Sequence, residues 1–203
     1  MPSRPSLKRR SPSLRGERGL PLGPTLAGCA AFALSWCVVS FASIFQPWLY
    51  GDVRFYENWG NWTATHLMPY RDFSLEYPPG ALLSFIWPIY ARKVFGYIGT
   101  YYDWFRIELL LIGLLAIVAA AWSLRLVGAS RKREYAALVF MGIAPMMLGP
   151  IALARYDYLP ALLTVLALAL ALSGRERTAC GVLAAGFVVK IYPAFLIDRK
   201  SVV

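Results

Sequence analysis

Long apolar runs separated by short charged clusters dominate the pattern of this chain. A helix needs about 20 predominantly apolar residues to cross the hydrocarbon layer of a membrane. Inside that layer its backbone groups must be paired within the segment itself, which favours helices. The pattern therefore predicts an all-α protein, a polytopic transmembrane helix bundle with five spans, at residues 25–45, 104–127, 135–154, 158–173 and 178–197.

A further apolar run, residues 80–90, is short and contains Pro88. Cytoplasmic flanks of membrane helices are enriched in Lys and Arg, and a basic cluster at residues 131–133 follows the run that ends at Val127. This cluster lies on the cytoplasmic side only if residues 46–103 stay together on the outer side. We therefore expect a large first extracytoplasmic loop over 46–103, with 80–90 as a juxtamembrane helix in the membrane interface.

The first 23 residues are rich in Pro, Ser and Arg and poor in apolar side chains. Such a segment cannot bury a core, so 1–23 is expected to be a disordered, basic cytoplasmic tail. A cleaved signal peptide is disfavoured, because the following run is long and no small-x-small cleavage site comes after it. Leu26–Cys29 resembles a lipoprotein cleavage box, but the apolar stretch before it is too short.

Composition agrees with a membrane protein. Of 203 residues, 58% are hydrophobic and 16% are charged, against about 25% charged in typical soluble domains. The net charge of +10 falls in clusters between apolar runs, which is typical of orientation signals and disfavours nucleic-acid binding. The three cysteines lack metal-ligand spacing, so neither a metal nor a cofactor is expected.

The expected topology gathers ionisable side chains on the outer side of the membrane. Carboxylates can act as general bases, and Arg and Lys can hold a phosphate through charge-assisted hydrogen bonds. Together these groups suit a reaction on a lipid phosphate. The candidates are Asp52, Glu57, the sole histidine His66, Arg71, Asp72, Glu76, Arg155, Asp157 and Lys190.

Four sequence blocks resemble the GT-C superfamily of polytopic glycosyltransferases. GDVRFYENW at 51–59 and PYRDFSLEYPPG at 69–80 are similar to the first external loop of these enzymes. RYDYLPALL at 155–163 and GVLAAGFVVKIYP at 181–193 are similar to later blocks. The nearest resemblance is to glycosyltransferase family 87, the polyprenyl-phosphate-mannose-dependent mannosyltransferases.

The resemblance implies a mechanism and partners. An acidic residue in the first external loop of these enzymes is the catalytic base, and Asp52 is the matching position. It would deprotonate an acceptor hydroxyl that attacks the sugar, with inversion, while polyprenyl phosphate leaves. The lipid-linked sugar is a substrate, the acceptor is a glycolipid, glycan or other hydroxyl, and the site faces outward from the plasma membrane. Implied substrate- or phosphate-binding residues are Arg71, Glu76, Arg155, Asp157 and Lys190, with Glu57, Asp72 and His66 as secondary candidates.

Structural roles stay open for these residues. Asp52 could cap a loop helix, Lys190 could extend towards the interface, and Arg71 could simply pair with Asp72, as Arg155 could with Asp157. Two other functions also stay open. A transporter or flippase component predicts charges inside the spans and internal repeats, and a non-catalytic multi-pass subunit would tolerate loss of the Asp52 carboxylate.

The end of the chain differs from the family pattern. GT-C enzymes are usually much longer, and the polar residues 198–203 follow the last apolar run abruptly. These six residues resemble the translation of a common sequencing adapter. We therefore expect 198–203 to be a non-native tail and the chain to be an N-terminal fragment, which the codons of the encoding DNA would test.

Overall fold

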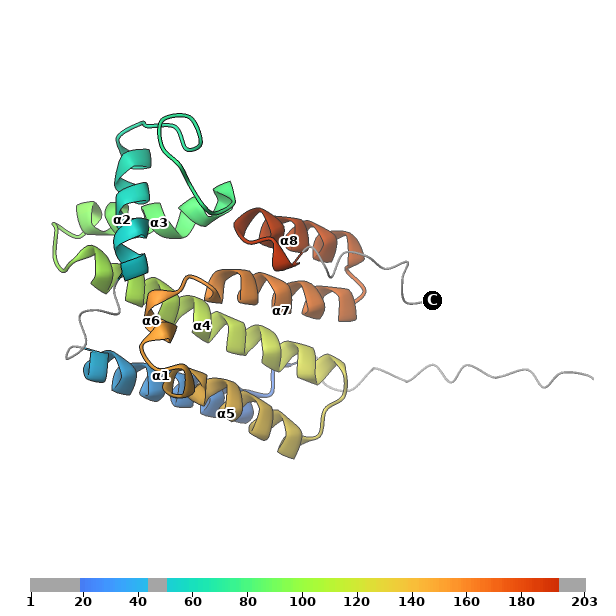
Figure 1. Ribbon diagram of the computed structural model, residues 1–203. Coiled ribbons are helices and arrows are strands. Elements are labelled where there is room, and N and C mark those ends of the chain that lie inside the picture. The colour runs from blue at the N-terminus through green and yellow to red at the C-terminus, as the bar shows by residue number, and fades with distance from the viewer. Residues whose placement is uncertain (1–18, 44–50, 194–203) are drawn as a thin grey trace, which may run out of the picture.

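The computed structural model describes residues 19–43 and 51–193. Within these ranges the protein is all-helical and has no strand; its only bridge joins Pro69 and Phe73. The all-α prediction is therefore confirmed. In chain order (Figure 1), the elements are α1 Leu22–Ser43, α2 Gly51–Ala64, the 3-10 turn η2 Pro79–Ala81, α3 Leu82–Val94, α4 Tyr101–Leu126, α5 Arg131–Leu148, α6 Ile151–Ala154, α7 Tyr158–Leu172 and α8 Glu176–Val189.

Two helices are long and apolar enough to cross a membrane by length and composition. They are α1, over Leu22–Ala42, and α4, over Tyr101–Leu126. Helix α7 is apolar but has only 15 residues. These criteria therefore identify two candidate membrane helices among the described residues, where the hydrophobic pattern predicts five spans.

The start of α1 differs from the expected boundary. The helix begins at Leu22, so the last two residues of the expected disordered tail are helical. The backbone amide of Thr25 donates to the Pro21 carbonyl at 3.0 Å, and Pro24 sits in the first turn, where proline is tolerated because no amide is needed there. Residues 1–18 of the expected tail, and the expected non-native segment 198–203, lie outside the described residues.

The expected continuous span 135–154 is interrupted. Helix α5 ends at Leu148, and Gly149 adopts φ 60° and ψ −146°, a conformation that glycine adopts far more readily than other residues. Pro150 follows and starts the short α6. Figure 1 shows α6 crossing from the end of α5 towards the start of α7. This break directs Arg155, which follows α6, towards the loop region after α1.

From residue 51 onwards the loop expected at 46–103 contains α2, η2 and α3, with a non-helical segment at 65–78, while 44–50 lie outside the described residues. Its expected helix at 80–90 appears as η2 and α3. Helix α2 packs closely on α3, since a Cβ on Gly60 would lie 2.3 Å from the Phe85 carbonyl oxygen. The Tyr101 hydroxyl donates to that same carbonyl at 3.0 Å. The loop therefore forms a compact aromatic module fixed to the start of α4.

Small residues bring the long helices together. A Cβ on Gly142 of α5 would lie 2.7 Å from the Gly28 carbonyl oxygen of α1. The Ser35 hydroxyl of α1 donates to the Gly142 carbonyl at 2.6 Å, and Gly113 of α4 accommodates the Phe32 ring. Such close backbone approach suits helices that associate without a strong hydrophobic driving force.

Candidate functional site

An ion pair joins the first loop to a distant part of the chain. Asp52 lies in the first turn of α2, and Arg155 follows α6 with an extended backbone. Their Oδ2 and Nη2 atoms are 2.8 Å apart, and the two side chains are 38% and 48% exposed. A carboxylate is favoured at a helix N-terminus, but this one also contacts a second element, so Asp52 is more than a helix-end residue.

A second ion pair begins two residues after Arg155. Asp157 precedes α7 without capping it through its side chain, and Lys190 follows α8 in an extended conformation. The Lys190 ammonium donates to the Asp157 carboxylate and lies 5.1 Å from the centre of the Tyr156 ring. The α6–α7 junction thus carries Arg155, Tyr156 and Asp157 in sequence. Asp52 pairs with Arg155, and Lys190 pairs with Asp157.

Three tyrosines connect the two ion pairs. The Tyr156 ring stands edge-on to the rings of Tyr56 and Tyr77, with centroid distances of 5.7 and 5.2 Å, and Tyr56 stacks on Phe85 at 4.4 Å. Tyr56 and Tyr156 are each 1% exposed. Their hydroxyls form no hydrogen bond of normal geometry within the described residues, and a buried hydroxyl without a partner is costly.

Burial also keeps these hydroxyls protonated. It is the largest cause raising the pKa of Tyr56, followed by the Tyr77 hydroxyl and the Asp52 charge. Burial likewise raises the pKa of Tyr156, with smaller contributions from Tyr77 and Asp157. Both phenols are therefore available as hydrogen-bond donors at neutral pH.

The Pro-Pro-Gly segment positions the end of α8. A Cβ on Gly80 would lie 2.7 Å from the Val188 carbonyl oxygen, so the η2 backbone packs directly against α8. Val188 is two residues before Lys190. Glycine at position 80 therefore permits the approach that brings the Lys190 ammonium to Asp157.

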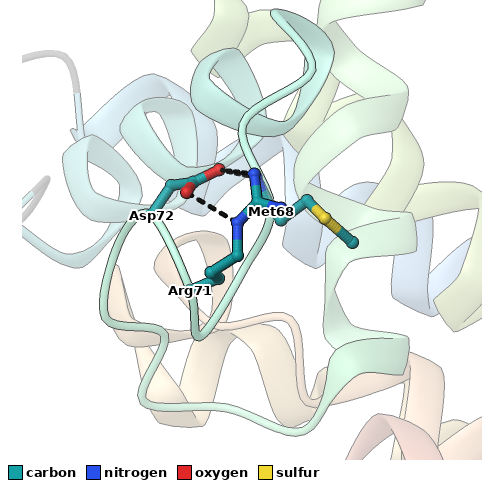
Figure 2. A network of polar contacts seen from close by, with 3 residues as sticks. All are labelled: Met68, Arg71 and Asp72. Carbon is teal, nitrogen blue, oxygen red and sulfur yellow. Dashed lines mark hydrogen bonds and ion pairs between the residues drawn. The ribbon is translucent and has the colours of Figure 1, made fainter.

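Arg71 and Asp72 pair with each other instead of joining this cluster (Figure 2). The Arg71 Nε and Nη2 atoms each donate to the Asp72 carboxylate at 2.9 Å. Asp72 Oδ2 also accepts from the Met68 amide at 2.8 Å. The Arg71 guanidinium, with the Met68 amide, holds the pKa of Asp72 below its usual range. Arg71 is exposed, so this arrangement matches the purely structural alternative.

The other predicted residues also lie apart from the two ion pairs. Glu76 is exposed and takes part in no ion pair or hydrogen bond within the described residues. His66 is exposed and adopts φ 70° in the turn after α2, where its amide donates to the Thr63 carbonyl at 3.1 Å. Glu57 lines a separate depression against α4. Across residues 19–43 and 51–193, no group of three or more His, Cys, Asp or Glu could hold a metal ion.

Sequence reasoning missed the tyrosines and the role of Gly80. A signal for two of the tyrosines was present. Tyr56 is four residues after Asp52, hence on the same helix face, and Tyr156 is adjacent to Arg155. Tyr77 and Gly80 had no comparable signal, because their contacts with Tyr156 and α8 depend on how the loop folds over the bundle.

No family model, curated protein or solved structure matches this chain. The resemblance to GT-C glycosyltransferases therefore stays a prediction that rests on the four sequence blocks. The geometry of the two ion pairs is an observation independent of those blocks.

Proposed function

We propose that this protein is a membrane glycosyltransferase that moves a hexose from a polyprenyl-phosphate donor to an extracytoplasmic hydroxyl acceptor, with inversion. Mannose is the sugar that the sequence resemblance favours, and a glycolipid or glycan is the favoured acceptor. The observation that carries the proposal is the Asp52–Arg155 ion pair, at 2.8 Å. It puts a carboxylate from the first loop and a cation from a later block in one site.

The membrane placement is part of the same proposal. Helices α1, α4, α5, α7 and α8 would be the five spans of a plasma-membrane protein, with the N-terminus in the cytoplasm. Basic residues flank the helix ends away from the two ion pairs. They are Arg125, which pairs with Glu134 across the α4–α5 turn, residues 131–133, Arg175 and Arg177. This distribution agrees with the rule that places Lys and Arg inside.

In the proposed reaction Asp52 is the general base. Its carboxylate takes the proton of the acceptor hydroxyl while that oxygen forms a bond to the anomeric carbon. The bond from the anomeric carbon to the phosphate oxygen breaks, and its electron pair leaves with polyprenyl phosphate. Positive charge on the sugar in an oxocarbenium-like transition state is stabilised by a nearby carboxylate.

The leaving phosphate needs fixed donors. Arg155 and Lys190 supply cations, and the buried hydroxyls of Tyr56 and Tyr156 supply neutral donors. Donors that are already oriented stabilise developing charge without reorganisation. In this arrangement the tyrosine hydroxyls gain the partner that they lack within the described residues.

The Asp52–Arg155 pair also implies an order of events. While Asp52 Oδ2 lies 2.8 Å from Arg155 Nη2, that oxygen is occupied by the guanidinium and is not open to the proton of an acceptor hydroxyl. A phosphate binds guanidinium with two parallel hydrogen bonds, so the donor would draw Arg155 away from Asp52. The base is then released only when a donor is bound, which would limit unproductive chemistry.

Replacing Asp52 by Asn tests the proposal. Transfer of labelled mannose from polyprenyl-phosphomannose to membrane acceptors should fall by about 10²–10⁴-fold, the usual contribution of a general base. Asp72→Asn is the matched control, since that carboxylate belongs to the exposed Arg71 pair, and it should keep normal transfer. Unchanged transfer in the Asp52 variant would refute the base assignment.

A non-catalytic multi-pass subunit is the second candidate. It is favoured by one observation, that both carboxylates are already paired and could serve only to fix the loop to the bundle. A transporter or flippase component has less support, because the two ion pairs gather around the α6–α7 junction instead of along the helices. The subunit reading predicts that any pair of opposite charges at positions 52 and 155 is acceptable.

A further inference from the structure

A polar cavity lies between α2 and the first turns of α4. Its volume is about 410 Å³, within the range of small-molecule sites. It is separate from the Asp52–Arg155 pair, because Asp52 and Arg54 point about 200° apart around a helix with 3.6 residues per turn. Its polar lining comprises Arg54 and Glu57 from α2, Thr100 just before α4, and Tyr101, Tyr102, Asp103 and Arg106 from α4.

The two carboxylates that line the cavity differ in their partners. Asp103 is committed to the start of α4, since its Oδ2 accepts from the Thr100 amide at 2.8 Å and from the Thr100 hydroxyl at 2.7 Å. Neither Arg54 nor Glu57 forms an ion pair or hydrogen bond within the described residues. With Asp103 committed, the cavity has two guanidinium groups and one available carboxylate.

Arg106 is held in place by its neighbour. Its guanidinium carbon lies 4.0 Å from the centre of the Tyr102 ring, and its Nη2 donates to the Tyr102 hydroxyl at 3.0 Å. Stacking on an aromatic ring orients a guanidinium while leaving edge donors for a ligand. The cavity therefore has one fixed cation on α4 and one exposed cation on α2.

The position of the cavity along α4 indicates its ligand. The uncharged stretch of α4 begins at Leu109, one turn after Arg106. Placing the hydrocarbon edge where this uncharged stretch begins, five residues after the start of the span expected at 104–127, puts Arg54 and Arg106 in the headgroup layer, where lipid phosphates are found.

We propose that this cavity binds the phosphate of an anionic lipid headgroup. Arg54 and Arg106 hold the phosphate, and Glu57 accepts hydrogen bonds from headgroup hydroxyls. The inference rests on the membrane placement but not on glycosyl transfer. It assigns the protein a lipid site distinct from the site of the Asp52–Arg155 pair.

Binding of a short-chain fluorescent phosphatidylglycerol to the full chain in uncharged detergent micelles tests the proposal. In the Arg54→Gln/Arg106→Gln variant the dissociation constant should rise roughly tenfold or more, because hydrogen bonds to charged groups are lost. Arg54→Gln alone should also weaken binding. Since Arg54 is exposed and forms no ion pair within the described residues, its loss does not threaten folding.

Lys132→Gln/Arg133→Gln is the matched control, since it removes the same charge from the α5 start. An equal loss of binding in this control would overturn the site, because it would show general charge attraction. Retained binding in the Arg54/Arg106 variant would overturn it as well.

Inorganic phosphate and glycerol 1-phosphate form the soluble arm of the experiment. The proposal expects them to compete with the lipid only weakly. If they bind as tightly as the lipid, the cavity is a free-phosphate site and the lipid assignment is wrong. No sugar donor is needed, so either failure leaves the glycosyltransferase proposal standing.

Discussion

Two ion pairs of this protein have nearly the same length but differ in what they connect. Asp52 and Arg155 are 2.8 Å apart and join α2 to the α6–α7 junction. Arg71 and Asp72 are 2.9 Å apart and are neighbours in the chain. A pair of sequence neighbours in solvent contributes little and needs no fold to form, whereas the first pair exists only if the bundle is assembled. The functional candidate is therefore distinguished by the separation of its two residues in the sequence, more than by the distance between their charged atoms.

Replacing the arginine of each pair sharpens this comparison most. Arg155→Gln should reduce sugar transfer by about 10²-fold or more, since a fixed cation at the leaving phosphate is lost. Arg71→Gln should leave transfer unchanged. Both are measured as the rate of mannose release from polyprenyl-phosphomannose.

A charge swap distinguishes chemistry from loop fixation. Asp52→Arg/Arg155→Asp keeps an ion pair between the same elements but puts the carboxylate in the wrong place. We expect the swapped protein to be more thermally stable than either single variant, close to the unmodified protein, while transfer stays lost. Recovery of transfer in the swapped protein would favour the non-catalytic subunit and contradict Asp52 as the base.

Gly80→Ala should have the next largest effect. The new Cβ would lie 2.7 Å from the Val188 carbonyl, so η2 and α8 must separate and carry Lys190 away from Asp157. We expect transfer to fall about tenfold, because a displacement of about 1 Å in a positioning element is costly. The Arg71–Asp72 pair would not be affected.

Gly181→Ala is the control for this change. Gly181 lies within α8 itself, and a Cβ there meets no atom within 4 Å. It should leave transfer unchanged and stabilise the helix by up to about 1 kcal/mol. If both variants behave alike in transfer and thermal unfolding, the proposed positioning role of Gly80 is wrong.

Tyr56→Phe should have the smallest effect on transfer, a few-fold decrease, since it removes one neutral donor. Its informative readout is stability. Within the described residues the lost hydroxyl is buried and forms no hydrogen bond of normal geometry, so its removal should not destabilise the protein and should raise the free energy of unfolding by about 1 kcal/mol. A marked loss of stability would show that the hydroxyl already has a partner in the unliganded protein.

The hydrophobic pattern predicted where most helices lie, because helix hydrogen bonds are local and each apolar run can be interpreted without knowing the rest of the fold. It misplaced boundaries where a few backbone groups decide the outcome. Helix α1 starts earlier than expected because prolines are accepted in its first turn, and the expected span 135–154 breaks where Gly149 adopts a positive φ.

For the candidate site, the sequence by itself determined the chemical types. It identified Asp52, Arg155, Asp157 and Lys190 as charged groups expected on one side of a membrane. Only the tertiary structure decided the pairs, because a side chain's partner depends on how distant helices pack. It placed Arg155 on Asp52 and Lys190 on Asp157, put Tyr56 and Tyr156 between them, and left Arg71 with its own neighbour.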